Sequence, residues 1–255
     1  MNFAIIIQAR TGSRRFPKKI LAKIDQRNVL EFFIDRLLQT FSKNKIIIAT
    51  TKFKRDNIVC NISKKKKIKF YRGPENNVLK RFLNCAIKFK VKNIVRVTPD
   101  CPLIDSRLLQ NMKKQFFTRR VDYLANTNPP AKSKFPDGSD IEIFKFKSLQ
   151  KISMLSKKKE DKEHVTHLFW KNPQKFKIKI INKKKNISNY KFSIDYKHDL
   201  FLVKKIINKI RAGKKYGTAD EIVNIIKNDR TLKKISATSR QKFIKNRKDL
   251  INFIF

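Results

Sequence analysis

IIIQARTGSRRFPKKIL, residues 5–21, begins as a buried strand and continues as a strongly basic loop. Its cationic side chains are crowded into residues 10–19: Arg10, Arg14, Arg15, Lys18 and Lys19. Like charges at this spacing repel one another, so an anion is expected to compensate them. The stretch therefore predicts a strand whose following loop binds an anionic ligand.

The segments that follow alternate between two patterns. Continuous apolar runs of strand length are followed by stretches whose apolar residues recur at helical spacing. The expected strands are 2–9, 45–51, 67–73 and 93–100, and the expected helices are 28–41, 56–65, 75–89 and 104–117. This alternation predicts βαβ units, and so an α/β fold with a mostly parallel, Rossmann-like sheet covered by helices on both faces.

The second half of the chain is mixed. We expect strands at 122–127, 140–146, 175–181 and 189–195, and helices at 159–172, 198–210 and 218–229. A length of 255 residues suits one sizeable α/β domain. We assign residues 1–235 to this domain and residues 236–255 to a basic C-terminal tail, which is expected to be helical.

The formal net charge of +43 has two explanations. Clustered Lys and Arg would indicate a nucleic-acid-binding protein. The chain is also rich in Lys, Ile, Asn and Phe, with only 5 Gly and 8 Pro, as expected from an A/T-rich genome in which surface positions drift to lysine. The cations are spread over the whole chain, which favours the compositional explanation.

Cysteine usage and hydropathy bear on location. Cys60, Cys85 and Cys101 form no CxxC pair, and so sparse a set is typical of reduced thiols in the cytosol. No apolar run approaches the roughly 18 residues that a membrane span needs. FAIII at 3–7 is too short for a signal sequence, and basic residues follow it rather than precede it. We expect a cytoplasmic protein without a membrane span.

The loop after the first strand is well suited to hold phosphate. In a doubly wound sheet, ligands bind outside the C-terminal ends of the strands, where this loop lies. Gly12 lets the backbone approach a ligand, and the amides around Gly12 and Ser13 can form an anion-binding nest. Arg10 and Arg15 can grip phosphate oxygens bidentately, and Lys19 can add a point charge. The loop is neither a GxGxxG fingerprint nor a GxxxxGK[ST] P-loop.

The same loop resembles the N-terminal signature of the sugar-activating cytidylyltransferases. Their pattern A-R-x-x-S-x-R-x-P-x-K is filled by Ala9, Arg10, Ser13, Arg15, Pro17 and Lys19. This superfamily includes the enzymes that make CMP-3-deoxy-octulosonate and CMP-acylneuraminate, and the resemblance is strongest to its branch of the spore coat polysaccharide SpsF type. Agreement with that branch continues, in order, in RVTPDCPLID (96–105), FPDGSDIEIF (135–144), EHVTHLFWKNP (163–173), SIDYKHDLFLVKKI (193–206) and KKYGTADEIVNII (214–226).

The resemblance, which covers about residues 3–235, implies a fold and a reaction. It implies a GT-A type, Rossmann-like sheet and nucleotidyl transfer, in which a sugar hydroxyl attacks the α-phosphate of CTP to give a CMP-sugar and pyrophosphate. The sugar would be acidic and would serve surface polysaccharide or glycoconjugate synthesis. Two sets of residues would bind the nucleotide: Arg10, Arg15 and Lys19 as catalytic charges, and Ala9, Gly12 and Ser13 as the rest of the loop. A homodimer would fit the same resemblance.

Two acidic residues follow predicted strands and are candidate metal ligands. Asp100 ends the strand predicted at 93–100, and Asp195 ends the strand predicted at 189–195. In the resemblance both positions hold Mg²⁺, which prefers carboxylate and phosphate oxygens and stabilises charge during phosphoryl transfer. The alternative is that Asp100, or Asp105, caps the next helix.

The chain departs from the family pattern in two places. Lys18 stands where the family usually has glycine, so the phosphate loop is bulkier and more cationic. The family motif V-D-T-P-E-D-L becomes IDYKHDL at 194–200, which keeps Asp195 and Asp199 but places His198 where the family has glutamate.

Asp140 and Glu142 form a D-x-E motif on a predicted strand, so their side chains share a face. Three roles are open to them. They could bind sugar hydroxyls in the acceptor pocket, form a DxD-like metal pair as in a glycosyltransferase that uses a nucleotide sugar, or face water on an edge strand.

Glu163, His164 and His167 lie on the helix predicted at 159–172. The two histidines are three residues apart and so share a face, but the segment is no H-E-x-x-H zinc motif. Glu163 and His164 match the family stretch and are expected to contact the sugar, whereas His167 does not match it. A capping or core-edge role is the alternative.

Three functions remain after these observations. The first is a cytidylyltransferase, whose partners are CTP and a small sugar and whose cofactor is Mg²⁺. The second is a GT-A glycosyltransferase, with Asp140 and Glu142 as metal ligands. The third is a nucleic-acid-binding protein, which the scattered distribution of lysine disfavours. The sequence favours the first.

Overall fold

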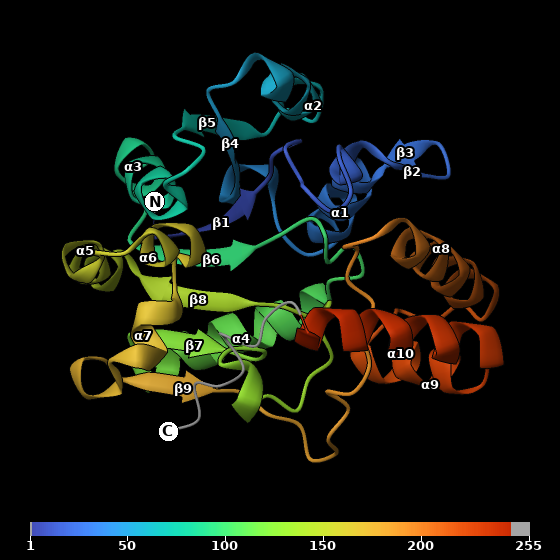
Figure 1. Cartoon of the computed structure of the whole chain (residues 1–255). Helices are drawn as coiled ribbons and strands as arrows, with labels where there is room; N and C mark the ends of the chain where they lie inside the picture. The colour runs from blue at the N-terminus through green and yellow to red at the C-terminus, as the bar shows by residue number, and fades with distance from the viewer. Residues whose placement is uncertain (1, 246–255) are drawn as a thin grey trace.

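The computed structural model describes residues 2–245, and a seven-stranded sheet runs through its centre (Figure 1). The strand order is β5-β4-β1-β6-β8-β7-β9, and β2 and β3 form a separate short hairpin. The strands are β1 (Phe3–Gln8), β2 (Lys23–Ile24), β3 (Arg27–Asn28), β4 (Ile46–Thr51), β5 (Lys69–Gly73), β6 (Asn93–Val97), β7 (Tyr123–Ala125), β8 (Glu142–Lys145) and β9 (Ile178–Ile180).

The pairing directions confirm the predicted, mostly parallel sheet. β1 pairs in parallel with both β4 and β6, and β4 pairs in parallel with β5. β8 runs antiparallel to its neighbours β6 and β7, while β7 and β9 are parallel. β8 is thus the one strand of the seven-stranded sheet that opposes the others. The C-terminal ends of the other strands meet at one edge, where ligands bind in such folds.

Helices cover both faces of the sheet (Figure 1). One face is covered by α1, α2 and α4, the other by α3, α5 and α7, and α8, α9 and α10 pack together beside α1. The helices are α1 (Val29–Leu38), α2 (Asn57–Lys65), α3 (Val78–Lys88), α4 (Ser106–Arg119), α5 (Phe146–Leu155), α6 (Lys159–His164), α7 (His167–Lys171), α8 (Lys197–Ala212), α9 (Ala219–Lys227) and α10 (Arg230–Lys245).

The apolar run of β1 supplies both cores because successive side chains of a strand point to opposite faces. Ile5 packs with Phe33 of α1 on one face, and Ile6 packs with Phe82 of α3 on the other. These four side chains are fully buried. Burying a side chain of this size contributes roughly 1.5–3 kcal/mol, so this short strand holds the two helical layers together.

The strand predicted at 189–195 is wrong. The segment is extended, but within residues 2–245 its backbone pairing with distant backbone is limited to an isolated bridge between Lys191 and Asp137 and a hydrogen bond from the Ile194 amide to the Asp100 carbonyl, at 2.7 Å. Its neighbours are loops beyond the sheet edge rather than strands. An alternating pattern predicts the extended backbone, but it does not tell whether a strand lies alongside to pair with it.

The helix predicted at 159–172 is two helices. α6 ends at His164, and Val165 takes a positive φ of 54°, after which α7 begins at His167. A β-branched residue rarely adopts this conformation, and it breaks the helical hydrogen-bond ladder. The histidines at 164 and 167 therefore do not share the face of one helix.

The boundary predicted after residue 235 falls inside α10, which packs against α8 and α9. Residues 246–255 of the predicted tail lie outside the described residues. Within residues 2–245, no helix is both long and apolar enough to cross a bilayer.

Gly138 is the glycine whose replacement should most disturb the fold. Its φ is 115°, and an added Cβ would lie 2.8 Å from the Ser193 amide nitrogen, against the segment that carries Asp195. We expect Gly138→Ala to lower the free energy of unfolding by about 1–3 kcal/mol, measured by urea denaturation. Gly213→Ala is the control, because Gly213 has an ordinary φ of −85°. Equal losses for the two variants would contradict the prediction.

Candidate active site

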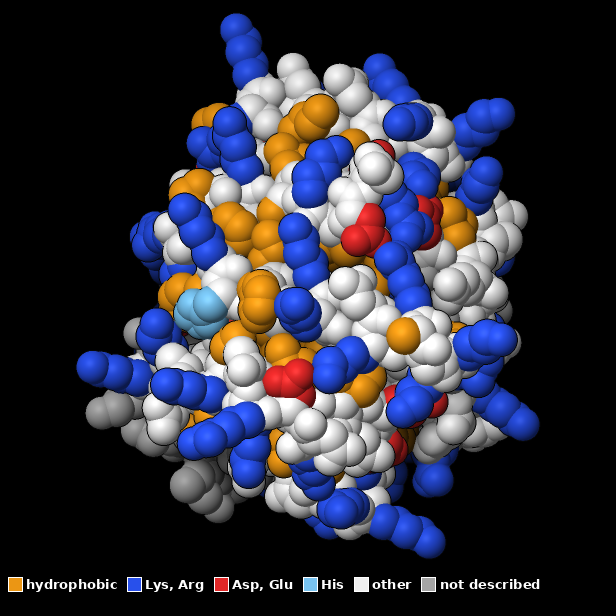
Figure 2. Space-filling view, turned by 90° about the vertical axis from the view of Figure 1, so that its right-hand side faces the viewer, with side chains coloured by type: hydrophobic (Ala, Val, Ile, Leu, Met, Phe, Trp, Pro, Cys, Tyr) orange, Lys and Arg blue, Asp and Glu red, His pale blue; other side chains and the backbone are white. Residues whose placement is uncertain are grey.

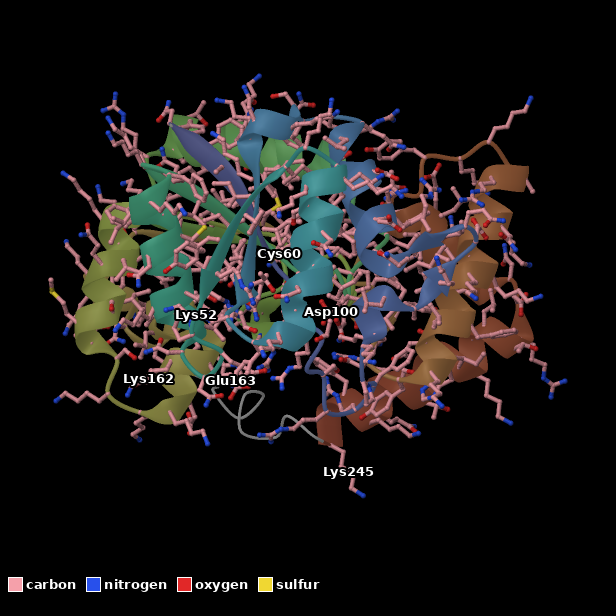
Figure 3. The ribbon with its side chains drawn as sticks, turned by 90° about the horizontal axis from the view of Figure 1, so that it is seen from above. Lys52, Cys60, Asp100, Lys162, Glu163 and Lys245 are labelled. Carbon is pink, nitrogen blue, oxygen red and sulfur yellow. The ribbon has the colours of Figure 1, made fainter. Side chains whose placement is uncertain are left out.

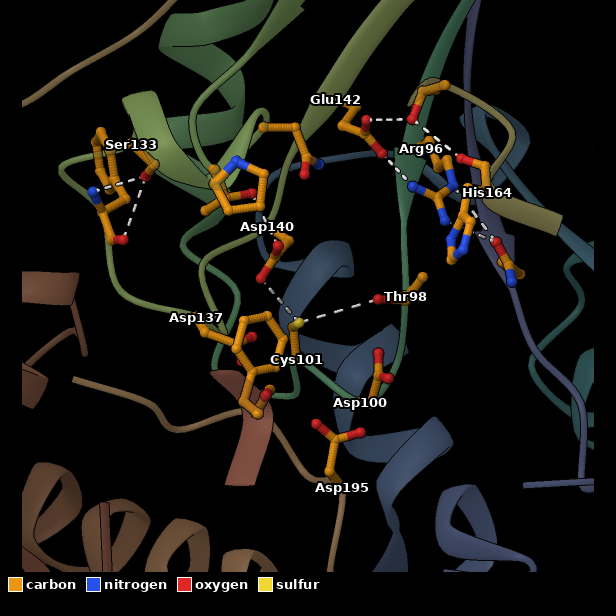
Figure 4. A pocket seen from close by; sticks show the side chains of 18 of the residues that line it. Arg96, Thr98, Asp100, Cys101, Ser133, Asp137, Asp140, Glu142, His164 and Asp195 are labelled. Carbon is orange, nitrogen blue, oxygen red and sulfur yellow. Dashed lines mark hydrogen bonds and ion pairs between the residues drawn. The ribbon is translucent and has the colours of Figure 1, made fainter. Parts of the chain in front are cut away.

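A cleft of about 280 Å³ opens at the C-terminal edge of the sheet. Its walls come from the ends of β1, β6 and β8, from the loops near them, and from α6, α7 and α10. Most of the predicted site residues line this cleft: Arg15, Lys19, Asp100, Asp195, Asp140, Glu142, Glu163 and His164. Figure 3 labels Asp100 and Glu163, and Figure 4 shows the cleft from close by, with Asp100, Asp195, Asp140, Glu142 and His164 labelled. Residues from distant parts of the sequence thus come together.

The basic loop beside the cleft is fixed by a buried carboxylate. The Thr11 amide and hydroxyl both donate to Asp56 Oδ1 at 2.7 Å, and Thr11 and Asp56 are buried. The Thr11 carbonyl accepts the amides of Ser13 at 2.9 Å and Lys18 at 3.0 Å, which closes the loop on itself. Lys18 has a φ of 55°, a left-handed conformation that glycine adopts without strain, which accounts for the glycine in the family pattern.

Arg10, Ala9, Gly12 and Ser13 lie in this loop but do not line the cleft. Ala9 is buried at the end of β1. The Arg10 guanidinium donates to Glu75 Oε1 at 3.1 Å, and Arg55 binds the same carboxylate. A Cβ at Gly12 would lie 2.9 Å from Glu75 Oε1, so a larger residue here would displace the Glu75 side chain. Sequence reasoning missed Glu75 as the partner of the loop.

The other two predicted cations of the loop reach the candidate metal ligands. Arg15 NH2 lies 2.5 Å from Asp195 Oδ1. Lys19 Nζ lies 2.8 Å from Asp100 Oδ2 and 3.4 Å from Asp195 Oδ1, and it donates to the Ile194 carbonyl at 2.8 Å. Burial lowers the pKa of Lys19, but the charges of Asp100 and Asp195 outweigh it and raise the pKa above its ordinary value. Lys19 therefore stays an ammonium between the two carboxylates.

Asp100 has the chemistry of a metal ligand. Its Oδ1 is buried without a hydrogen-bond partner among the described residues, and Figure 4 shows Asp100 and Asp195 next to each other in the cleft. Burial raises the pKa of Asp100, but the charge of Lys19 lowers it by more. The pKa is therefore below its ordinary value, and the group is ionised at neutral pH. An ionised oxygen without a partner is costly unless a ligand satisfies it. The residues therefore fit Mg²⁺, with phosphate and water as further ligands.

The capping role considered for Asp100 belongs to Asp105 instead. Asp105 Oδ1 accepts the amides of Arg107 and Leu108, each at 3.0 Å, at the start of α4. Asp100 is thereby left to face the cleft. Within residues 2–245, no three His, Cys, Asp or Glu side chains are arranged to hold a metal on their own. A metal here would thus depend on oxygens of the substrate.

A buried ammonium supports the Asp195 segment. Lys191 is fully buried, and its Nζ donates to the carbonyl and hydroxyl of Ser193 at 2.9 and 2.7 Å. The same nitrogen lies 3.3 Å from Asp195 Oδ2, 3.5 Å from Asp199 Oδ2 and 3.9 Å from Asp137 Oδ2. Burial lowers the pKa of Lys191, but the three carboxylates raise it well above its ordinary value.

The second aspartate kept from the family motif, Asp199, has a structural role. Asp199 is fully buried, and its Oδ2 accepts the amides of Asp195 and Tyr196, at 2.8 and 2.9 Å. Its other oxygen accepts the Ser239 hydroxyl, to which His198 Nε2 also lies close, at 2.8 Å. Asp199 and His198 thus fix the turn that presents Asp195, and α10 supplies the serine.

Glu142 is at the wall of the cleft but is already satisfied. It is 2% exposed, and Oε1 accepts the hydroxyls of Tyr123 and Thr166, both at 2.6 Å. Its Oε2 pairs with Arg96, which also donates to Gln8 Oε1 at 3.1 Å. Because β6 and β8 pair with Arg96 opposite Glu142, the two side chains share one face. Glu142 therefore holds Arg96, a cleft cation that sequence reasoning missed.

Asp140 is likewise saturated by donors. It lies just before β8, where Oδ1 accepts Thr127 Oγ1 at 2.8 Å and Oδ2 accepts the Gly138 amide at 2.9 Å and Cys101 Sγ at 3.4 Å (Figure 4). Neither Asp140 nor Glu142 offers the open oxygens of a metal pair. This disfavours the metal-binding role that a glycosyltransferase would need from them. Contact with the sugar stays the prediction for both residues.

Glu163 and His164 reach the cleft from the C-terminal end of α6. Glu163 is exposed and His164 is half-buried. His167 is buried instead, with Nε2 lying 2.7 Å from Asp161 Oδ1, and the rings of His164 and His167 are 5.8 Å apart in an edge-to-face arrangement. His167 thus has the core role considered for it, while Glu163 and His164 remain candidates for sugar contact.

With the site described, comparison with known proteins decides the family. The family model described as "Cytidylyltransferase" matches residues 4–249. The chain belongs to the cytidylyltransferase family. It is therefore an enzyme of the nucleotidyltransferase class, as the resemblance of its motifs predicted. The match includes α10, which the predicted boundary at 235 had divided.

Individual relatives agree with this assignment. An uncharacterised protein of Methanocaldococcus jannaschii is 34% identical over 178 residues, which are 70% of this chain and 71% of that protein. Spore coat polysaccharide biosynthesis protein SpsF of Bacillus subtilis is 27% identical over 88% of this chain and 94% of its own. The solved structure of a cytidylyltransferase from Leptospira borgpetersenii has a TM-score of 0.78 and 28% identity, and covers 100% of this chain and 98% of that chain.

The buried ammonium makes a testable contribution to stability. Lys191→Met keeps the length of the side chain but leaves Asp137, Asp195 and Asp199 without their shared counter-charge. We expect the free energy of unfolding, measured by urea denaturation, to fall by about 3–5 kcal/mol. Lys185→Met is the control because Lys185 is exposed. A loss no larger than that of the control would show that Lys191 is dispensable.

Proposed function

We propose that this enzyme transfers the cytidylyl group of CTP to an acidic sugar and releases pyrophosphate. In this reaction an oxygen–phosphorus bond forms between a sugar hydroxyl and the α-phosphorus, the bond from that phosphorus to the leaving pyrophosphate breaks, and the hydroxyl proton is released. The observation that carries the proposal is the Asp100 carboxylate beside the basic loop: it shares Lys19 with Asp195, and one of its oxygens lacks a hydrogen-bond partner among residues 2–245.

The geometry supports different roles for the cations of the loop. Arg15 and Lys19 line the cleft and would contact the phosphates. Arg10 is held by Glu75 at 3.1 Å outside the cleft and would support the loop around the nucleotide. Asp100 and Asp195 would hold Mg²⁺. The ion, when bound, would stabilise the charge that develops on the α-phosphate and the leaving pyrophosphate. The protein contributes positioning and electrostatic stabilisation through side chains that are already fixed.

The nature of the sugar rests on resemblance. The chain resembles enzymes that activate 3-deoxy-octulosonate and acylneuraminate, both acidic sugars, and it is similar to SpsF over 88% of its length. A role in surface polysaccharide or glycoconjugate synthesis follows from the same likeness. A homodimer and a cytoplasmic location stay predictions.

The high net charge does not call for a nucleic-acid partner. On the face shown in Figure 2, Lys and Arg side chains are scattered among other side chains instead of forming one continuous basic track. Scattered solvated cations interact weakly with distant partners because salt screens them over about 10 Å. We therefore propose small-molecule substrates only.

Nucleotide binding is tested first by thermal shift with CTP, UTP, ATP and GTP, each with and without Mg²⁺. We expect CTP with Mg²⁺ to give the largest rise in Tm, because ligands that bind only the folded state stabilise it by mass action. Arg15→Ala should abolish the rise, and Asp100→Asn should remove its dependence on Mg²⁺. Arg14→Ala is the matched control, since Arg14 is exposed on the same loop.

The result would oppose the proposal if no triphosphate raised the Tm, or if Arg14→Ala reduced the CTP effect as much as Arg15→Ala. A larger rise with UTP, ATP or GTP than with CTP would retain nucleotidyl transfer but replace the nucleotide.

A further inference from the structure

The cations that line the cleft differ in how they are neutralised. Arg15 pairs with Asp195, Lys19 pairs with Asp100, and Arg96 pairs with Glu142. Arg240 of α10 also lines the cleft, but it forms no ion pair with any residue from 2 to 245. Its Nε is buried and has no hydrogen-bond partner among those residues. A buried donor of this kind costs free energy unless a bound ligand accepts from it.

The structure holds Arg240 firmly in this position. On the same helix, Ser236 Oγ accepts the Lys191 amide at 3.0 Å and donates to the Lys191 carbonyl at 2.9 Å, while Ser239 binds Asp199. The guanidinium of Arg240 lies 5.4 Å from the ring centroid of Phe243, which also lines the cleft. α10 is thus attached to the segment that carries Asp195, and Arg240 is aimed into the cleft by a fixed helix.

The place of Arg240 separates it from the phosphate loop. Ser236, about one turn before Arg240 on α10, bonds to the Lys191 backbone, and Lys191 forms a β-bridge with Asp137. Asp137 lies three residues before Asp140, which is predicted to contact the sugar, and both line the cleft with Arg240. Burial lowers the pKa of Arg240, and the charge of Asp137 raises it in part. Arg15 and Lys19 would serve the phosphates. α10 therefore brings Arg240 to the wall of the cleft that is formed by the loop of Asp137 and Asp140.

We propose that Arg240 binds the carboxylate of the acceptor sugar and that α10 is the element that selects acidic over neutral sugars. A planar guanidinium matches a carboxylate with two parallel hydrogen bonds, an interaction that a hydroxyl or an amide cannot reproduce. The proposal rests on the proposed function, since it needs a sugar acceptor. It adds the residue that recognises the acid and the part of the chain that supplies it.

The test follows pyrophosphate release from CTP with 2-keto-3-deoxy sugar acids, each beside its carboxamide, and with neutral and amino sugars. Wild-type enzyme should prefer an acid to its carboxamide. Arg240→Gln should lower kcat/KM for the acid by about 10- to 100-fold, mainly through KM, and should bring the acid and the carboxamide to similar values. Arg240→Lys should recover part of the preference. Lys234→Gln, an exposed lysine of α10, should change nothing.

The outcomes separate this inference from the proposed function. If Arg240→Gln keeps the preference for the acid, or if neutral sugars are the best acceptors of the wild type, Arg240 is not the carboxylate site while nucleotidyl transfer stands. If Arg240→Gln reduces the CTP thermal shift as Arg15→Ala does, Arg240 binds phosphate and the inference is wrong. If the wild-type enzyme releases pyrophosphate with none of the sugars tested, the proposed function fails and this inference fails with it.

Discussion

One buried ammonium connects the parts of the candidate active site. Lys191 lies within 3.9 Å of three carboxylates from different segments: Asp137 before β8, Asp195 after the extended segment, and Asp199 in α8. A buried charge of either sign would be strongly unfavourable alone, so these segments are stable only together. Because Asp195 faces the cleft and Asp137 belongs to the loop of Asp140, this contact fixes the position of the Asp195 segment relative to the Asp140 loop across the cleft.

The distribution of acidic residues is as informative as the excess of basic ones. The chain has only 20 Asp and Glu, yet six of them line the cleft: Asp100, Asp137, Asp140, Glu142, Glu163 and Asp195. Most are matched by a cation or by hydroxyl and amide donors, as Glu142 is by Arg96. A cleft lined this way would repel an extended polyanion, but it can take a compact triphosphate whose charge is offset by Arg15, Lys19 and a metal ion. The overall charge and the site therefore have separate physical explanations.

Sequence patterns predicted the parts of the structure that depend on local order. The strands of the central sheet and the helices from 2 to 119 were found from their apolar patterns, although the β2–β3 hairpin was missed. Asp100 and the basic loop were found because they follow strands, whereas Asp195 follows an extended segment that was taken for one. The patterns failed where a contact joins distant segments, as in the extended stretch at 189–195. Lys191 was hidden among 63 Lys and Arg, although it alternates with Phe192 and Ile194, which placed it on one face with Ser193 and Asp195. Arg240 carried no signal, since it lies in a helix of many basic residues.

The position of α10 late in the chain affects when the cleft is completed during synthesis of the polypeptide. Every other described element of the candidate site precedes α10 in the sequence, and α10 supplies the serines that bind Lys191 and Asp199. Chains are synthesised from the N-terminus at about 5–20 residues per second, so residues 230–245 are added after the rest of the site. Until Ser236 and Ser239 dock, the cleft lacks one wall. A nascent chain of this enzyme would thus complete its cleft only when this last described helix is in place.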